Sequence, residues 1–392
     1  MTHSPHYARK RTYLFPFLAT LVFLLFHLLV YWGLLVTSSP FVGVQNALKI
    51  FICLNFLATA CYIFFRQSPI IPQWLYLLLS ISVGVIFSLF VFMIFYQFLA
   101  LLGRWIISSE QVSQVSNGKE NIYLGYLQLI IIALSMIYVI YGIYKGRARP
   151  FLQKITLPIP HLKIPLKVIQ LSDIHIGKLM QKPHICQIVQ MVNEQKPDII
   201  VLTGDIIDTY AHNACAALQA LKDLQAVYGV YYVLGNHEYF YDTPNIIEQI
   251  QTLGFHTLIN QNITISQDNT PLITIIGLAD LMGERMDYLP PDIHQAFDGI
   301  NTSLPTILLS HQPKIIKKLQ DKAINLILSG HTHGGQLSPF GLAVLLDQPF
   351  LMGLHKLCED QYLYINQGTG FWGPPMRVGT RAEITSIQLL PK

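Results

Sequence analysis

Charged side chains are scarce in this chain of 392 residues, in which Asp, Glu, Lys and Arg make up 12% and hydrophobic residues 52%. A soluble globular protein normally carries about 25% charged residues. The hydrophobic excess lies in the first 150 residues, so we expect a membrane-embedded segment there. The net charge of +4 gives no argument for nucleic-acid binding, and no nucleic-acid partner is expected.

Cysteine is scarce as well, with five residues and no framework spacing. Cys53 and Cys61 lie in an apolar run, and Cys186, Cys215 and Cys358 are isolated. This pattern predicts free thiols and excludes a disulfide scaffold, but it leaves the compartment undecided.

Four long apolar runs occupy residues 13–36, 41–65, 74–102 and 122–144, and each could cross about 30 Å of hydrocarbon as a helix. Asn46, Lys49 and Asn55 count against the second run. A signal peptide is the competing interpretation of the first run, but its apolar stretch is too long and no small-x-small cleavage site follows. We predict a transmembrane helical domain of about four spans over residues 1–150.

Basic residues favour one orientation of these spans. With the N-terminus inside, the outer loops hold only Arg104, Lys119 and arguably Lys49. The inner side then holds Arg9, Lys10, Arg11, Arg66, Lys145, Arg147, Arg149 and Lys154. An even number of spans places residues 151–392 in the cytoplasm, a prediction that fails if one run does not cross.

The stretch from Asn121 to Ser172 contains no acidic residue and ends in a series of cations. Such a segment could lie against anionic lipid headgroups, or its cations could be ordinary anchors of the last span. Pro150, Pro158 and Pro160 exclude a helix there and predict an extended linker or a first strand.

The second half alternates buried strands with helices, which predicts an α/β fold. Strands are expected at residues 166–171, 198–202, 230–234, 306–309, 325–328 and 382–389. Helical spacing is found at 183–195 and 211–226, and Pro183 and Pro244 suit first helical turns.

Polar motifs follow five of these strands directly. They are Asp173-Ile174-His175, Gly204-Asp205-Ile206-Ile207-Asp208, Gly235-Asn236-His237-Glu238, Ser310-His311 and Gly330-His331-Thr332-His333. Loops at the carboxyl ends of strands converge in α/β sheets, so these side chains should meet. Carboxylate, imidazole and amide donors without thiolate suit hard-to-borderline divalent metals, and a two-metal phosphoesterase site is predicted.

The motifs resemble those of the calcineurin-like metallophosphoesterase family, in particular its bacterial membrane-associated branch, over roughly residues 151–392. The resemblance implies a metallophosphoesterase domain there, a four-layer αββα sandwich of two mixed sheets. It also implies two divalent ions, of manganese, zinc or iron. The corresponding ligands are Asp173, His175 and His333 for the first ion, Asp205 as the bridge, and Asn236, His311 and His331 for the second.

In the family, the residue at the place of His237 is not a ligand but stabilises charge or protonates the leaving oxygen. Asp208 matches the carboxylate that orients this imidazole. Glu238 could act only by supporting the turn. Because a regular strand would hold side chains two residues apart roughly 7 Å from each other, Asp173 and His175 can share an ion only if the backbone leaves the regular pleat. The same holds for His331 and His333, where neighbouring glycines should permit it.

Two further segments have open interpretations. Arg377, in the loop that begins at Asn366, could reach a phosphate or belong to a structural Gly/Pro turn. The apolar segment from Leu337 to Met352 follows His333 and either packs into the core or admits acyl chains.

We therefore expect a multi-pass enzyme of the bacterial inner membrane that hydrolyses a phosphoester or pyrophosphate, with a lipid-linked substrate favoured. UDP-2,3-diacylglucosamine is one substrate that the resemblance implies. The alternatives are a broad-specificity phosphodiesterase and a catalytically silent membrane scaffold; the retention of every motif residue argues against the scaffold.

Overall fold

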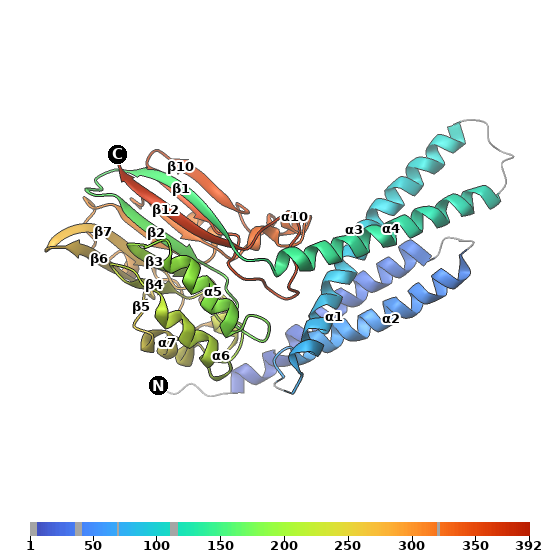
Figure 1. The fold of residues 1–392 in the computed structure, drawn as a ribbon, viewed down its shortest axis with the longest axis horizontal. Helices are drawn as coiled ribbons and strands as arrows, with labels where there is room; N and C mark the ends of the chain where they lie inside the picture. The colour runs from blue at the N-terminus through green and yellow to red at the C-terminus, as the bar shows by residue number, and fades with distance from the viewer. Residues whose placement is uncertain (1–5, 36–40, 69, 110–116, 320–321) are drawn as a thin grey trace. The chain divides into compact units, whose positions relative to one another are not determined.

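A computed structural model describes residues 6–35, 41–68, 70–109, 117–319 and 322–392 (Figure 1). The chain forms two compact units, one of Met1–Tyr144 with Gly373–Met376 and one of Lys145–Trp372 with Arg377–Lys392. The side chains of Arg9, Lys10, Arg11, Arg104 and Lys119, on which the predicted orientation partly depends, lie outside the described residues.

The first unit consists of the helices α1 (His6–Leu35), α2 (Val42–Phe65), α3 (Gln73–Ser109) and α4 (Asn117–Gly146). Each contains a stretch that is long and apolar enough to cross a membrane: Pro16–Leu35, Val42–Phe65, Gln73–Leu102 and Ile122–Gly146. The four predicted apolar helices are therefore confirmed, and the protein is a membrane protein.

Polar side chains inside the first unit bond to one another between helices. His27 Nε2 of α1 lies 3.0 Å from Asn55 Oδ1 of α2, and Thr59 Oγ1 of α2 lies 3.0 Å from Ser82 Oγ of α3. Because Asn55 is buried and paired in this way, its presence in the second apolar run does not oppose a membrane span.

The second unit contains two mixed six-stranded sheets. The first has the order β1-β12-β2-β3-β4-β5, in which β12 runs antiparallel to β2 and the other neighbours are parallel. Its strands are β1 (Phe151–Ile159), β2 (Leu166–Leu171), β3 (Ile199–Thr203), β4 (Val230–Val233), β5 (His256–Thr257) and β12 (Glu383–Pro391).

The second sheet has the order β10-β11-β9-β8-β7-β6, with antiparallel pairs at its two edges. Its strands are β6 (Gln261–Gln267), β7 (Thr270–Gly277), β8 (Thr306–Leu309), β9 (Leu326–Ser329), β10 (Gly353–Cys358) and β11 (Gln361–Ile365). The strands predicted from continuous apolar runs all form, within one or two residues at each end.

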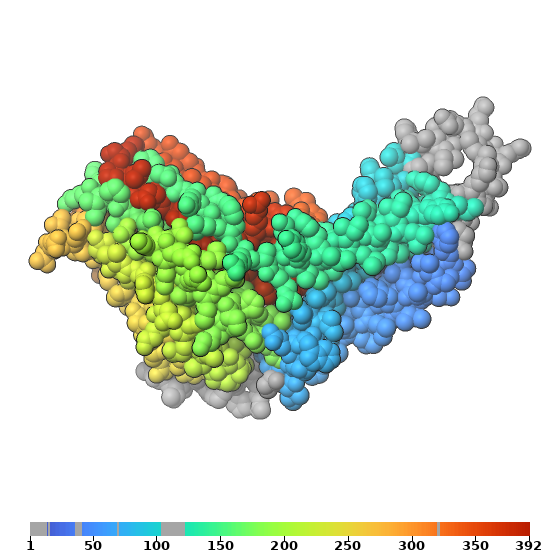
Figure 2. All heavy atoms as spheres, viewed as in Figure 1, coloured from blue at the N-terminus to red at the C-terminus, as the bar shows by residue number. Residues whose placement is uncertain are grey.

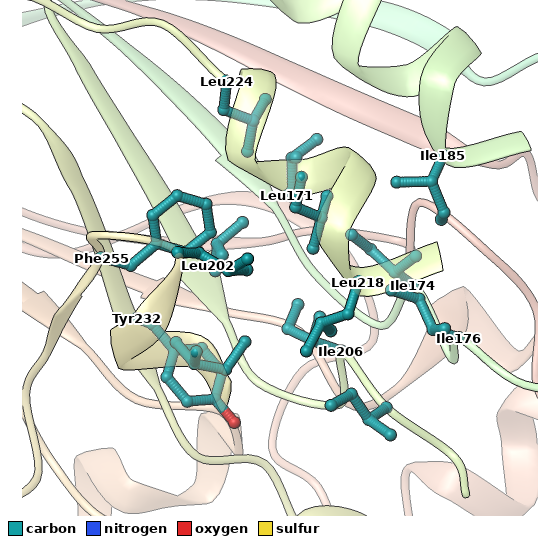
Figure 3. Packing of buried hydrophobic residues seen from close by; sticks show 14 of the residues in the cluster. Leu171, Ile174, Ile176, Ile185, Leu202, Ile206, Leu218, Leu224, Tyr232 and Phe255 are labelled. Carbon is teal, nitrogen blue, oxygen red and sulfur yellow. The ribbon is translucent and has the colours of Figure 1, made fainter. Parts of the chain in front are cut away.

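Alternation along the strands divides the core into layers. On β2, Val168 packs between the two sheets, whereas Ile169 packs under the helices that cover the first sheet. These helices are α5 (Lys182–Asn193), α6 (Ala211–Leu218) and α7 (Thr243–Thr252), and Figure 3 shows Ile185 and Leu218 beside residues of the strands. Short helices α8 (Met282–Met286) and α9 (Ile293–Ala296) follow β7, and a third apolar cluster packs on the outer face of the second sheet. The αββα sandwich is confirmed.

The proline-rich segment after the last membrane helix forms β1, so the strand interpretation is the correct one. It pairs in parallel with β12, and the space-filling view shows the two segments side by side (Figure 2). The predicted helix at 211–226 is shorter than expected, because α6 ends at Leu218 and a 3₁₀ turn, Gln219–Asp223, follows.

Candidate metal centre

All five predicted motifs lie in loops at the carboxyl ends of strands, three in the first sheet and two in the second. Asp173 follows β2, Asp205 follows β3 and Asn236 follows β4, while His311 follows β8 and His331 follows β9. The two sheets therefore deliver donor groups to one common edge.

Asp173, His175 and His333 form one group, whose candidate ligand atoms all lie within 4.8 Å of one another. His175 Nε2 is 3.0 Å from His333 Nε2, and His333 Nε2 is 3.3 Å from Asp173 Oδ1. All three side chains are buried. This arrangement of two imidazoles and one carboxylate could hold a divalent cation.

Asp205, His311 and His331 form a second group of the same kind. Asn236 Oδ1 lies 3.1 Å from His311 Nε2 and supplies an amide oxygen beside it. The Nδ1 atom of His311 lies 2.8 Å from the carbonyl oxygen of Thr203, so it donates there and leaves Nε2 free to coordinate.

One carboxylate oxygen faces both groups. Asp205 Oδ2 lies 3.2 Å from His311 Nε2 in the second group and 3.9 Å from His175 Nε2 in the first. A carboxylate that bridges two ions must lie between the two groups of ligands, and Asp205 meets this requirement. The seven residues predicted as ligands are thus brought together by the fold.

The backbone leaves the strand conformation at these residues, as the two-residue spacing requires. Asp173, His175, Asp205, His331 and His333 have φ values of 52°, 53°, 53°, 70° and 49°. Such left-handed conformations in residues other than glycine store strain and concentrate at functional sites.

The sequence predicts that the glycines near His331 provide the unusual backbone conformation, but the histidines provide it themselves. Gly334 and Gly335 have positive φ values, but Gly330 does not. A Cβ at Gly330 would collide with Ser172 Oγ and with Asp173 Oδ2, so this glycine allows the β9 loop to approach the β2 loop closely. The histidines themselves adopt the unusual backbone.

Burial and charge set suitable protonation states. Burial and the neighbouring His237 lower the pKa of His175 to about 3, and burial and His311 lower the pKa of His331 to about 3. Both imidazoles are therefore neutral at pH 7, as metal ligation requires. Burial alone would raise the pKa of Asp205, but His311 and His237 outweigh it and hold this pKa well below its usual range.

His237 sits beside the two groups and has its own carboxylate partner. Its Nδ1 lies 2.7 Å from Asp208 Oδ1, and its Nε2 lies 3.8 Å from Asp205 Oδ2. Burial would lower the pKa of His237, but Asp205 and Asp208 outweigh it and raise this pKa to about 9. The imidazole is therefore protonated at neutral pH, which is the state that a proton donor needs.

Glu238 has a larger part than the sequence indicated. Its fully buried carboxylate accepts hydrogen bonds from the backbone N–H groups of Asp205, Ile206, Ile207 and Gly235, at 2.7–3.2 Å. It therefore ties the β3 loop to the β4 loop. The sequence feature that could have indicated this role is the position of Glu238 directly after Asn236 and His237.

Arg377 does not reach toward a phosphate. It is fully buried, and its guanidinium donates to the carbonyl oxygens of Gln367, Gly368 and Gly370 at 2.6–3.1 Å and of His333 at 3.3 Å. The interpretation as a structural turn is the correct one.

Much of the apolar segment after His333 is exposed, which corrects the expectation that it packs into the core, although Leu337 is buried and Phe350 packs against the third apolar cluster. It includes α10 (Gly341–Val344), next to which Leu346 is 90% exposed, and Leu342 within it is 70% exposed. Phe340, Leu345 and Met352 are exposed as well.

The buried donors of carboxylate, imidazole and amide define a metal site at the common edge of an αββα sandwich, which is the arrangement of a metallohydrolase. Comparisons with known proteins agree with this. The family model described as calcineurin-like phosphoesterase matches residues 166–335. An uncharacterised metallophosphoesterase of Campylobacter jejuni is 33% identical over 97% of this chain and 99% of its own.

Two further relatives extend the comparison. An uncharacterised metallophosphoesterase of Helicobacter pylori is 33% identical over 89% of this chain and 90% of its own. A transmembrane protein with metallophosphoesterase domain from Danio rerio is 32% identical over 81% of this chain and 74% of its own. The chain belongs to the calcineurin-like metallophosphoesterase family.

Proposed function

We propose that the protein is a membrane-anchored dimetal phosphohydrolase whose substrate is a lipid-linked phosphoester or pyrophosphate, such as UDP-2,3-diacylglucosamine. Residues 1–150 anchor it and residues 151–392 carry the site. The observation that carries the two-metal assignment is the position of Asp205 Oδ2 between histidines of both groups. In this proposal Asp173, His175 and His333 hold one ion, Asp205 bridges, and Asn236, His311 and His331 hold the other.

Divalent ions bound there supply an acidified water and neutralise the charge that develops on the phosphoryl oxygens. The nitrogen and oxygen donors favour manganese, zinc or iron. Asp208 fixes the Nδ1–H of His237, so that Nε2 presents its proton toward the bridging carboxylate. His237 thereby stabilises the transferred phosphoryl group and protonates the leaving oxygen.

Two features support a lipid-linked substrate. The exposed leucines around α10 lie in the segment that begins directly after the His333 turn, so apolar surface is close in sequence to the ligands. Such surface in a membrane-anchored enzyme can take up acyl chains. The cationic stretch before β1 is suited to anionic headgroups.

The location proposed is the bacterial inner membrane with residues 151–392 in the cytoplasm, on the basis of the basic residues in the short loops. Reporter fusions after Lys154 and before Arg9 should both report the cytoplasm. Activity of an alkaline phosphatase fused after Lys154 would place residues 151–392 in the periplasm and refute the proposed location.

The test is an assay of the full-length protein in detergent with Mn²⁺, Zn²⁺ or Mg²⁺, on an aryl phosphodiester and on the acylated sugar nucleotide with its deacylated analogue. Removal of metal should abolish hydrolysis, and Asp205→Asn should lower it more than Asp173→Asn, because the bridge serves both ions. Full activity of Asp205→Asn without metal would refute the dimetal proposal.

The preference for an acylated substrate can be tested with variants of the exposed leucines near α10. Leu345→Asp and Leu346→Asp should raise KM for the acylated substrate and spare the aryl phosphodiester, since each buried CH₂ contributes about 0.8 kcal/mol to binding. Val227→Asp, at an exposed site outside this segment, is the control. A parent enzyme with no acyl preference would instead indicate a broad-specificity phosphodiesterase.

A further inference from the structure

Exposed aromatic side chains surround His237 and have no part in the metal chemistry. The ring centroid of Phe240 lies 5.5 Å from that of His237 at an interplanar angle of 72°, and Trp372 lies 6.1 Å away at 79°. Phe240 is in the turn after β4, while Trp372 is in the loop after β11. Two loops that are distant in the sequence thus bring rings to the same imidazole.

The rings of Phe240 and Trp372 are exposed to solvent, unlike the aromatic rings of the core. Phe240 is 42% exposed and Trp372 is 43% exposed. Within the described part of the chain, neither belongs to any of the hydrophobic clusters of the second unit. Large aromatic surfaces left in contact with water beside a catalytic group are typical of ligand sites.

Trp372 is fixed in place by a side chain of the metal centre's own loop. Gln336 Nε2 donates to the carbonyl oxygen of Trp372 at 2.7 Å, and the N–H of Trp372 donates to Gln336 Oε1 at 2.9 Å. The N–H of Gln336 donates in turn to the carbonyl oxygen of His333. This chain of bonds orients the loop of Trp372 relative to a predicted ligand, which is the preorganisation that a binding site needs.

Further aromatic side chains with polar groups lie next to Asp208, the partner of His237. Tyr241 donates its hydroxyl to Asp208 Oδ1 at 2.8 Å, and Tyr210 packs against Tyr241 with centroids 5.6 Å apart. Tyr210 also stacks on the exposed His212 at 5.8 Å. A phenolic hydroxyl that donates to a carboxylate can still accept a hydrogen bond, so this group of side chains can bond the polar edge of a planar heterocycle.

We propose that Phe240 and Trp372 form a subsite for a planar aromatic group of the substrate, specifically the base of a nucleoside phosphate, on the His237 side of the phosphoryl group. This inference rests on the proposed phosphohydrolase function and makes its substrate a nucleotide derivative. Stacking against aromatic side chains is the interaction that would recognise the base.

The test measures equilibrium binding of AMP, UMP and ribose 5-phosphate to the full-length, Mn²⁺-loaded protein in detergent by calorimetry. All three carry the same phosphate, and only the nucleotides carry a base. The parent protein should bind AMP more tightly than ribose 5-phosphate. Phe240→Ala and Trp372→Ala should each weaken AMP binding about tenfold to a hundredfold, leave ribose 5-phosphate unchanged, and be rescued in part by Trp372→Phe.

Tyr288→Ala removes an equally exposed ring outside the site and serves as the matched control. Equal affinity of the parent for AMP and ribose 5-phosphate would overturn the subsite, as would an equal loss of both ligands in Trp372→Ala. Dodecyl phosphate, measured in the same way, is the acyl probe, and a selective loss of its binding in Trp372→Ala would overturn the base subsite and assign the rings to an acyl chain. A protein that binds both ligands but hydrolyses no phosphoester refutes the proposed function and leaves the subsite standing.

Discussion

Replacement of Glu238 by glutamine tests whether one buried carboxylate holds the metal-binding loops together. Oε1 of Glu238 accepts from the N–H groups of Ile206 and Ile207, and Oε2 accepts from those of Asp205 and Gly235. A glutamine retains one oxygen. In either orientation its NH₂ group would face two backbone donors, with no acceptor for them.

The expected cost follows from those two lost acceptors. A buried donor left unsatisfied costs about 1–3 kcal/mol, so Glu238→Gln should destabilise the second unit by about 2–6 kcal/mol. For a domain of this size that corresponds to a drop in Tm of about 5–20 °C. Because the affected N–H groups flank Asp205 and Asn236, metal affinity should fall together with stability.

The assay combines thermal unfolding of the detergent-purified protein with metal analysis after dialysis against a trace-metal buffer. Glu248→Gln is the matched control, because Glu248 is exposed on α7 and should change stability by no more than about 0.5 kcal/mol. A Glu238→Gln protein that retains the parent Tm and both metals would refute the role assigned to this carboxylate.

Three further predictions concern single side chains. His237→Ala should retain both metals but lower kcat by about 10²–10⁴, as expected for an acid–base group, and a loss of metal would make His237 a ligand. Asp208→Asn removes a carboxylate that raises the pKa of His237 to about 9, so the alkaline limb of the pH profile of kcat should move to lower pH; an unmoved limb would show that another group sets it. Burial raises the pKa of Asp280 from 3.8 to about 6, which means that its contribution to stability is fully present only below pH 3.8 and is lost progressively as the pH rises through 6. Asp280→Asn should therefore raise Tm at pH 7.5 by an amount worth about 1–2 kcal/mol and have a smaller effect at pH 4.5, and equal Tm changes at both pH values would contradict this.

The elements that the sequence predicts well are those whose signal is local. The strands that precede the motifs are mostly apolar runs, because they are buried on both faces, and such runs need no knowledge of their partners; β2 alone among them contains a charged residue, Lys167. The two-residue spacing of Asp173 and His175 also predicts a departure from the pleat, which appears as positive φ values. The convergence of the motifs follows from their common place at strand ends.

What depends on long-range partners could not be predicted. The insertion of β12 between β1 and β2 joins segments more than 200 residues apart, and no local pattern specifies it. Arg377 looks like a phosphate ligand by residue type, and only its carbonyl partners show otherwise. The exposure of Leu346 is likewise invisible in a sequence, because apolar character alone predicts burial.

The strained backbone of the site is stabilised by two buried side chains, the carboxyl group of Glu238 and the guanidinium of Arg377. Residues in left-handed conformations cost of order 1–3 kcal/mol each, and the predicted ligands contain several. Glu238 accepts from N–H groups of the loops after β3 and β4, whereas Arg377 donates to carbonyl oxygens of the loops after β9 and β11. Each sheet thus has one buried side chain that bonds to the backbone groups left unpaired where its strands end. Because both are fully buried, removal of either would leave several unpaired backbone groups at once, and the geometry of the donors depends on these two residues as much as on the ligands.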